Sequence, residues 1–259
     1  MVRKIDRTGE ENINTFGSKM VITDYRNRRD IDVYFPEYNW TFKNVNYGNF
    51  KNKQIKCPYE KRYYGVGYLG EGRHKMSENG KDTKCYKTWH HMLERCYDNK
   101  YKEKHPTYVG CQTYEKWHNF QEYSEWFNDN YYQIEGERMA LDKDILYKGN
   151  KIYSPDTCIF VPQTINNLFV KHDKNRGNSC IGSTLRKNGK YQVRCNIYDF
   201  NIGKPKNEHL GVYDTQEKAF EVDKYYKEKN IKEVADYYKE KIPSKLYDAL
   251  SNYEVEIHD

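Results

Sequence analysis

The sequence predicts an α+β protein built from a small N-terminal β module, a central region of helices with a ββα unit, and a C-terminal three-stranded antiparallel sheet packed on a helix. Two observations support this class. Apolar residues alternate with period two near both ends of the chain and recur at helical spacing between them. Aromatic residues make up 16% of the 259 residues, so the chain can bury a core although 32% of its residues are charged.

The composition also argues against several classes of protein. No run approaches the roughly 20 apolar residues of a membrane helix, and the first residues lack the apolar segment of a secretory signal. We therefore expect a cytoplasmic protein with no membrane partner. The seven cysteines form no Cys-x-x-Cys pair, so we expect buried thiols rather than a disulfide framework or a zinc ribbon.

The N-terminal β module is expected over residues 1–64. Met20–Ile22, Ile31–Phe35 and Trp40–Phe42 are short apolar or alternating segments, and polar turns separate them. The glycines of Gly65–Gly72 then predict a turn-rich connector, because neither a helical pattern nor a Gly-Lys-Ser/Thr triplet follows them. The residues of this module point to no particular function.

The central region, residues 65–170, begins with two predicted amphipathic helices. Apolar and aromatic residues recur every three or four positions in Tyr86–Cys96 and again in Trp117–Phe127. The first of these helices carries His90 and His91. Because adjacent residues of a helix point in different directions, we expect at most one of the two imidazoles to serve a site.

The end of the central region predicts the order strand, loop, strand, helix. The strands are expected at Leu141–Ile145 and Ile159–Val161, the turn at Lys148–Lys151, and the helix over residues 162–169. Asp142 and Asp144 are two positions apart, so on a strand both carboxylates leave the same face, where a divalent cation would neutralise them. An exposed strand with charged side chains is the alternative explanation.

Residues 171–259 predict an antiparallel sheet followed by helices. The strands are expected at Ser179–Arg186, Lys190–Tyr198 and His209–Tyr213, with a turn at Asn188-Gly189. A helix begins after Thr215, a second helical stretch contains Ile231 to Tyr238, and Pro243 begins a third.

Basic residues are concentrated at the start of this C-terminal region. Between Lys171 and Asp214 there are nine lysines and arginines against four acidic residues, which accounts for most of the net charge of +6. Clustered cations favour a polyanionic partner, because each neutralised phosphate releases condensed counterions. A solvated basic surface is the alternative explanation.

The second strand of the sheet separates apolar from polar side chains. Tyr191, Val193, Cys195 and Ile197 are expected to face the helix, which leaves the residues between them on the opposite face. Arginine suits guanine in a major groove, and asparagine or glutamine suits adenine. The expected DNA-binding residues are Thr184, Arg186, Lys187, Gln192, Arg194 and Asn196.

Four segments of this region resemble the ethylene-response-factor type of DNA-binding domain, which also occurs in phage nucleases. They are Gly182, Asn188–Tyr191, His209–Thr215 and Glu217–Phe220. The resemblance extends from Gly177 to the end of the chain. It implies a three-stranded sheet that lies in the major groove of double-stranded DNA, with a helix behind it. Asp199–Asn207 departs from the family pattern as an insertion between the second and third strands.

The segment before it resembles the HNH, or His-Me finger, nucleases. The matching residues are Leu141–Ile145, Gly149–Lys151, Tyr153–Pro155, Phe160–Pro162 and Ile165–Asn167. The resemblance places Asn166 at the helix Asn of that family, and Lys143 and Asp144 where the family has an acid and a His. The general-base His of the family is therefore absent.

The HNH resemblance implies a Mg²⁺ ion held by Asp142, Asp144 and Asn166. It implies catalytic roles for Asp144 and Asp142, with the metal polarising the scissile phosphate. An imidazole would come from elsewhere in the chain, and we select His91 over His90 and His105. From Gly65 onward, the arrangement is similar to free-standing homing endonucleases of phages, in which a cleavage finger is joined to a binding module.

The sequence thus predicts a protein that binds double-stranded DNA and hydrolyses it with a divalent metal ion, as an endonuclease or nickase of phage or mobile-element type. The alternative is a non-catalytic DNA-binding protein, regulatory or blocking, that retains the HNH scaffold. An RNA-binding module that stacks bases on aromatic side chains is a third and weaker hypothesis, because the best motif resembles a duplex reader.

Overall fold

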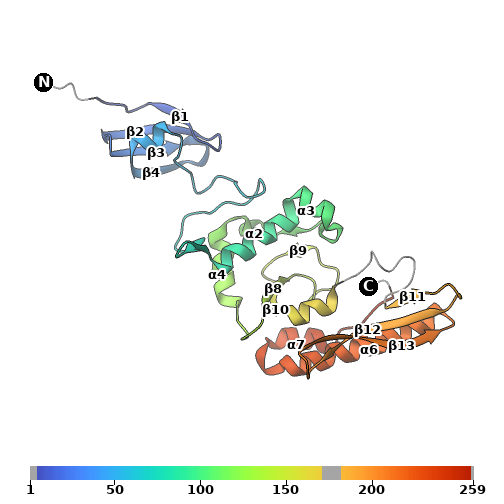
Figure 1. The fold of residues 1–259 in the computed structure, drawn as a ribbon. Coiled ribbons are helices and arrows are strands. Elements are labelled where there is room, and N and C mark those ends of the chain that lie inside the picture. Colours follow the sequence, from blue (N-terminus) through green and yellow to red (C-terminus); the bar gives the residue numbers. More distant parts are fainter. Residues whose placement is uncertain (1–4, 171–181, 258–259) are drawn as a thin grey trace. The chain divides into compact units, whose positions relative to one another are not determined.

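A computed structural model describes residues 5–170 and 182–257 of the chain and has the expected mixture of helices and antiparallel sheets (Figure 1). The chain forms two compact units. The first unit comprises residues 1–129 and 151–154, and the second unit comprises residues 130–150 and 155–259. None of the helices in the described residues combines the length and the apolar character needed to cross a membrane.

The first unit begins with an antiparallel sheet in the order β1-β2-β3-β4. Its elements are β1 (Glu11–Ile13), β2 (Lys19–Asn27), β3 (Asp30–Phe35), the 3-10 turn η1 (Pro36–Tyr38), β4 (Trp40–Val45) and helix α1 (Tyr47–Lys51). The three predicted strands are confirmed as β2 to β4. The alternation in β3 fits its packing, because Ile31, Val33 and Phe35 are fully buried. The sequence analysis missed β1, which is short and mostly exposed.

The rest of the first unit is mainly helical. Its elements are the pair β5 (Ser77–Glu78) and β6 (Lys81–Asp82), α2 (Lys84–Tyr97), α3 (Asn99–Lys104), η2 (Pro106–Tyr108), β7 (Gln112–Thr113), η3 (Glu115–His118), α4 (Phe120–Asn130), and β9 (Ile152–Tyr153), which pairs with β7 in parallel. The helical spacing is confirmed, because Trp89 and Leu93 of α2 and Phe120 and Tyr123 of α4 are buried. Trp117 lies in η3 instead of in α4.

The second unit contains the expected order of strand, loop, strand and helix. Its β8 (Met139–Asp142) pairs with β10 (Ile159–Pro162), and the helix α5 (Gln163–Asn166) and the turn η4 (Asn167–Phe169) follow. The predicted turn is confirmed, since Asn150 N–H donates to the Tyr147 carbonyl at 3.0 Å. The predicted strand Leu141–Ile145 is wrong at its end. The strand stops at Asp142, whose carboxylate accepts the backbone N–H groups of Asp144 and Ile145 and turns the chain.

The second unit ends with a three-stranded antiparallel sheet and two helices. The strands β11 (Ser183–Leu185), β12 (Tyr191–Asp199) and β13 (Lys204–Tyr213) are followed by α6 (Gln216–Tyr238), η6 (Lys239–Lys241) and α7 (Ser244–Ser251). The turn at Asn188-Gly189 is confirmed, and Gly189 supplies its positive φ of 78°. The two helical stretches predicted after Thr215 form the single helix α6. Residues 179–181 of the first predicted strand lie outside the described residues.

The segment Asp199–Asn207 extends the hairpin of β12 and β13. The two strands stay paired as far as Asp199 and Lys204, and Gly203 N–H closes the turn on the Asp199 carbonyl at 2.9 Å. The segment is expected from the sequence to be an insertion between strands, because its glycine, proline and polar residues hide the strand pattern.

One core joins the ββα segment to the C-terminal helices. Ile159, Val161 and Ile165 pack in the same buried cluster as Val234 of α6 and Leu246 of α7. The N-terminal sheet has a core of its own, which includes Met20, Val33 and Phe50. Five of the six cysteines in the described residues are buried, as expected, and Cys85 is partly exposed, whereas Cys180 lies outside those residues.

Candidate nucleic-acid interface and metal-binding residues

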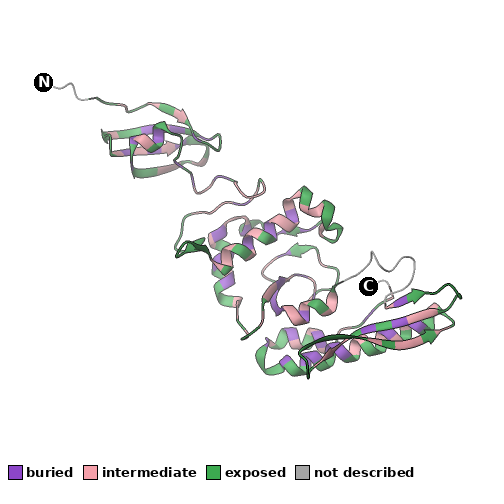
Figure 2. Ribbon diagram, viewed as in Figure 1, coloured by how far each residue is buried: buried purple, intermediate pink, exposed green. Residues whose placement is uncertain are grey.

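The C-terminal sheet has one apolar and one polar face. Val193 and Cys195 of β12 are buried on the side of α6, whereas Arg194 and Asn196, which alternate with them, are exposed. Figure 2 shows buried and exposed segments alternating along this sheet. The predicted separation of side chains is therefore found in the strand that carries it. Of the other expected DNA-binding residues, Thr184, Arg186 and Lys187 are exposed and Gln192 is half-buried.

Hydrogen bonds connect the side chains of this polar face. Arg194 Nη1 donates to Asn207 Oδ1 at 2.8 Å, and Asn207 Nδ2 donates to Asn196 Oδ1 at 2.8 Å. Arg186 Nε donates to Gln192 Oε1 at 3.2 Å. Five of the polar side chains on the sheet thus hold one another in defined positions while remaining accessible. We call Thr184, Arg186, Lys187, Gln192, Arg194, Asn196 and Asn207 the outer face.

Asn207 is a member of the outer face that the sequence analysis missed. It lies opposite Asn196 in the register of β12 and β13, so the two side chains leave the sheet on the same side. Asn207 is the last residue of the segment Asp199–Asn207, in which the sequence does not show a strand pattern. The alternation of the predicted third strand, continued backward from His209 to Asn207, was the available indication.

A β-bulge lies next to Arg194. Val193 pairs with Gly211, but Arg194 pairs with His209, so Leu210 is the extra residue on β13. A bulge increases the local right-handed twist and changes the direction of the neighbouring side chains. The outer face is therefore twisted at Arg194, and exposed His209 lies beside that residue.

Ion pairs neutralise some of the cations of this sheet. Lys190 Nζ lies 2.7 Å from Asp214 Oδ1, and Lys206 Nζ lies 2.9 Å from Glu208 Oε1. Arg186, Lys187 and Arg194 form no ion pair with a carboxylate of the described residues. The positive charge that remains free of ion pairs is thus carried in part by the outer face.

Asn230 of α6 covers the part of the β12 edge that the short strand β11 does not reach. Its Oδ1 accepts the N–H of Tyr198 at 2.8 Å, and its Nδ2 donates to the carbonyl of Asn196 at 3.3 Å. The buried Asn230 side chain thus makes the hydrogen bonds that a neighbouring strand would otherwise make to these two backbone groups. This hydrogen bonding fixes β12 on α6.

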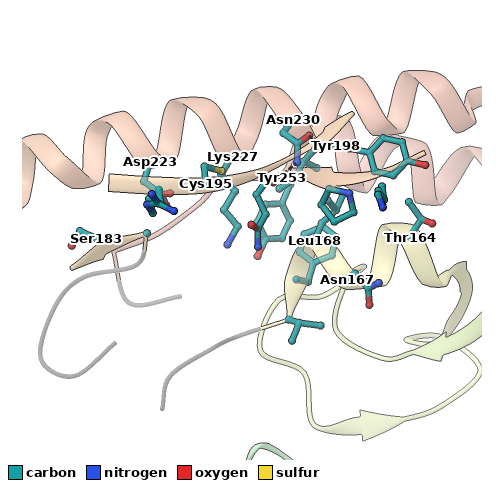
Figure 3. Close-up of a pocket in the computed structure, with 18 of the residues that line it drawn as sticks. Thr164, Asn167, Leu168, Ser183, Cys195, Tyr198, Asp223, Lys227, Asn230 and Tyr253 are labelled. Carbon is teal, nitrogen blue, oxygen red and sulfur yellow. Dashed lines mark hydrogen bonds between the residues drawn. The ribbon is translucent and has the colours of Figure 1, made fainter. Parts of the chain in front are cut away.

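A pocket of about 700 Å³ lies beside this covered edge. Figure 3 shows Asp223, Lys227 and Asn230 reaching it from α6, and Thr164, Asn167 and Leu168 from the α5–η4 turn. Val170 and Gly182 also line the pocket, and they border the segment that lies outside the described residues. The pocket is on the α6 edge of the sheet, and of the outer face only Thr184, Arg194 and Asn196 reach it.

Asp142 and Asp144 lie together at the end of β8. Asp142 Oδ1 accepts the N–H of Asp144 at 2.8 Å and the N–H of Ile145 at 2.7 Å. Burial, reinforced by the negative charge of Asp144, raises the pKa of Asp142 to about 6. Asp144 is half-exposed, and its Oδ2 lies 3.1 Å from Nζ of buried Lys143. Asn150 Nδ2 donates to the Lys143 carbonyl at 2.7 Å and holds the turn in place.

The donor chemistry of this pair fits a hard divalent cation. The charge of Asp144 adds to burial in raising the pKa of Asp142, and a cation between the two carboxylates would relieve their repulsion. Asn166, expected as the third ligand, ends α5, a helix that packs against β8. In the described residues, no third His, Cys, Asp or Glu joins Asp142 and Asp144 within metal-binding range.

His91, the imidazole expected for catalysis, lies on α2 in the first unit, whereas Asp142, Asp144 and Asn166 belong to the second unit. The ligand atoms of His91, His90 and Glu94 all lie within 4.8 Å of one another. The two imidazoles therefore come together on one side of α2, although we expected adjacent helix residues to point apart. Adjacent residues differ by about 100° around a helix, and ring rotation brings both imidazoles to Glu94. The i, i+3 and i, i+4 spacing was the overlooked indication.

His105, an alternative source of the imidazole, follows α3. Its ring packs on Tyr101 with the centroids 4.4 Å apart, and the residue is exposed. It belongs to the first unit and is absent from the group formed by His90, His91 and Glu94.

The chain matches no model of a protein family, no curated protein and no solved structure.

Proposed function

We propose that this protein binds double-stranded DNA through the outer face of its C-terminal sheet. The observation that supports the proposal best is the exposed, hydrogen-bonded row of Arg194, Asn207 and Asn196 on the side of the sheet away from α6. A three-stranded sheet can enter a major groove, and its polar side chains then meet the base edges. The free charges of Arg186 and Lys187 would contact phosphates.

The hydrogen bonds of the outer face favour selective binding. Arg194 is positioned by Asn207, so little side-chain entropy is lost when it reaches a base. An arginine can donate two hydrogen bonds to O6 and N7 of guanine, and such a contact discriminates against other bases by about 1 to 3 kcal/mol. We assign Arg194 to base recognition and the hairpin residue Lys187 to the backbone of the duplex.

We further propose that the ββα segment hydrolyses the bound DNA with a divalent metal ion, as an endonuclease or nickase. Asp142, Asp144 and Asn166 would hold the ion. A bound Mg²⁺ would polarise the scissile phosphate and stabilise the leaving oxygen. The half-exposed carboxylate of Asp144 is the group of this chain that can accept a proton from water, whereas Asp142 Oδ1 is occupied by two backbone N–H groups.

A non-catalytic DNA-binding protein is the second candidate. Lys143 stands where the HNH resemblance expects an acid, and its ammonium group lies 3.1 Å from Asp144. This ion pair occupies the carboxylate that would otherwise act as the base, which supports a scaffold without nuclease chemistry.

Duplex binding is tested with the full chain and a pool of random duplex oligonucleotides. The dissociation constant should rise steeply with salt, because the lysines and arginines of the sheet release counterions from phosphates. Recovery of an enriched sequence from the pool would support base recognition. A failure to bind duplex DNA at low ionic strength would overturn the proposal.

Hydrolysis is tested by incubating the protein with supercoiled plasmid DNA that contains the selected sequence, with Mg²⁺ or Mn²⁺. Nicked or linear product is expected, and Asp144→Ala should abolish it without weakening DNA binding. Asp156→Ala serves as the control, because it removes another exposed carboxylate of the same unit. Intact plasmid with DNA binding retained would favour the non-catalytic protein, and cleavage by Asp144→Ala would refute the assigned site.

A further inference from the structure

Three potential metal ligands gather on the surface of α2. His90, His91 and Glu94 each bring one ligand atom to within 4.8 Å of the other two. His90 and Glu94 are half-buried and His91 is exposed, so an ion can reach the group from solvent. In the described residues, this is the only group of three or more His, Cys, Asp and Glu side chains that is close enough to hold a metal ion.

A tight turn brings Tyr64 to the same place. Tyr64 and Gly65 both have positive φ, 55° and 75°, and Val66 N–H donates to the Tyr63 carbonyl at 3.1 Å. A non-glycine residue rarely adopts this conformation. The turn places the Tyr64 hydroxyl 3.4 Å from His90 Nε2. The rings of Tyr64 and His90 also pack edge to face, with their centroids 5.2 Å apart.

The three ligands match a borderline transition ion better than Mg²⁺. Imidazole suits zinc, nickel and copper, whereas Mg²⁺ prefers a shell of oxygen atoms. A tetrahedral zinc ion with bonds of about 2.1 Å separates its ligand atoms by roughly 3.4 Å. Side-chain rotations that move the ligand atoms by about 1 Å would therefore bring the three groups to bonding distance from one zinc ion.

We propose that His90, His91 and Glu94 form a binding site for a zinc-class transition ion, with at least one coordination position left for water or for the Tyr64 hydroxyl. Two His ligands and one Glu satisfy a zinc ion that keeps an open position. The site lies in the first unit and does not depend on the proposed DNA interface or on Asp142 and Asp144 of the second unit.

The proposal is tested on the full-length, metal-free protein by competition with a chromogenic zinc chelator, without DNA. One Zn²⁺ per chain should bind, and Mg²⁺ in large excess should not displace it. Cobalt should give visible absorption of nitrogen and oxygen coordination without a thiolate charge-transfer band. Failure to bind Zn²⁺, or a cobalt spectrum dominated by thiolate ligation, would overturn the proposal, because the chain also contains seven cysteines.

Variants of the ligands locate the ion. His91→Ala and the isosteric Glu94→Gln should each weaken zinc binding by 10-fold or more, with far-UV circular dichroism unchanged. His105→Ala and Arg194→Ala are controls that should leave zinc affinity as it is, because both lie outside the group. Unaltered affinity in both ligand variants would place the ion elsewhere and refute the site. Failure of DNA binding by the wild-type protein would not affect this result.

Discussion

Arg194 is held in place by its neighbours on the outer face. Its contact with Asn207, and the contact of Asn207 with Asn196, link side chains that are 11 to 13 positions apart in the sequence. The alternation of β12 was sufficient to predict that Arg194 and Asn196 point outward. The link between them was not predicted, because it depends on the register of a strand whose sequence has a weak strand pattern.

Arg194→Ala should reduce the discrimination between the selected duplex and a duplex with one altered base by about 1 to 3 kcal/mol, if the guanidinium reads that base. Competition binding at constant salt measures this quantity. Lys232→Ala is the matched control, because Lys232 is an exposed cation on α6. An unchanged sequence preference in Arg194→Ala would remove this residue from base recognition.

Asp142 should make the free energy of unfolding of the second unit depend on pH. Burial and the charge of Asp144 raise its pKa from 3.8 to about 6, so the native state binds this proton more tightly than the unfolded chain. The stabilisation by the bound proton is complete at pH values below the pKa that Asp142 has in the unfolded chain. It is lost as the pH rises through the pKa that Asp142 has in the folded protein. The free energy of unfolding should therefore fall between about pH 4 and pH 6.

Asp142→Asn should remove most of this slope, since an amide Oδ1 can still accept the N–H groups of Asp144 and Ile145. Urea denaturation at several pH values measures the effect. Glu135→Gln removes an exposed carboxylate of the same unit and should leave the slope unchanged. Equal slopes in the wild type and Asp142→Asn would show that the carboxyl is not perturbed in solution.

Among the secondary-structure elements, β11 and α6 depend on a glycine at their contact. Gly182 precedes β11 with a φ of 72°, and a Cβ atom at this position would lie 1.9 Å from Cγ of Asp223 on α6. Gly189, in the hairpin turn, has a similar φ of 78° but no atom within 4 Å of the corresponding position. A comparison of alanine substitutions at Gly182 and Gly189 therefore separates the cost of backbone strain from the cost of a steric clash.

Gly189→Ala should destabilise the protein by about 1 kcal/mol, the cost of a positive φ in alanine. Gly182→Ala has the same strain and must also displace a buried carboxylate, so we expect a further loss of about 1 to 3 kcal/mol. Urea denaturation followed by circular dichroism measures both variants. Equal losses would show that Asp223 moves away without cost.

The elements also show where sequence patterns are reliable. Alternation and helical spacing predicted β3, β12, α2 and α4, because a buried face imposes a period on apolar residues. The end of β8 was predicted three residues too late. The side chain of Asp142 terminates that strand by a local hydrogen bond, and an aspartate in a turn looks the same in the sequence as an aspartate in a strand.

In the molecule as a whole, the N-terminal sheet and the second unit have separate cores. Changes in period and composition predict boundaries near residues 64 and 170. The two compact units divide the chain near residue 129, with residues 151–154 returning to the first unit through the pairing of β9 with β7. This pairing joins two-residue strands that have no pattern of their own.

Separate cores predict separate responses to destabilisation. Gly182→Ala should accelerate hydrogen exchange of backbone amides in β12 and α6, and it should leave exchange in β2 and β3 unchanged. Hydrogen–deuterium exchange with mass spectrometry of the full chain measures both. A similar acceleration in β2 and β3 would show that the two cores unfold together.

The sequence alone determined the α+β class and the outward direction of Arg194 and Asn196, because each follows from a local period. The expectation that Asp142 and Asp144 share one face of a strand was wrong, because the strand ends at Asp142. Tertiary structure decided the position of Asn207 beside Arg194, the use of Asn230 as a substitute for a strand, and the arrival of Tyr64 at His90. Those contacts join residues that are 13 to 34 positions apart. Strand register and packing bring such residues together, and local patterns in a single sequence do not encode either.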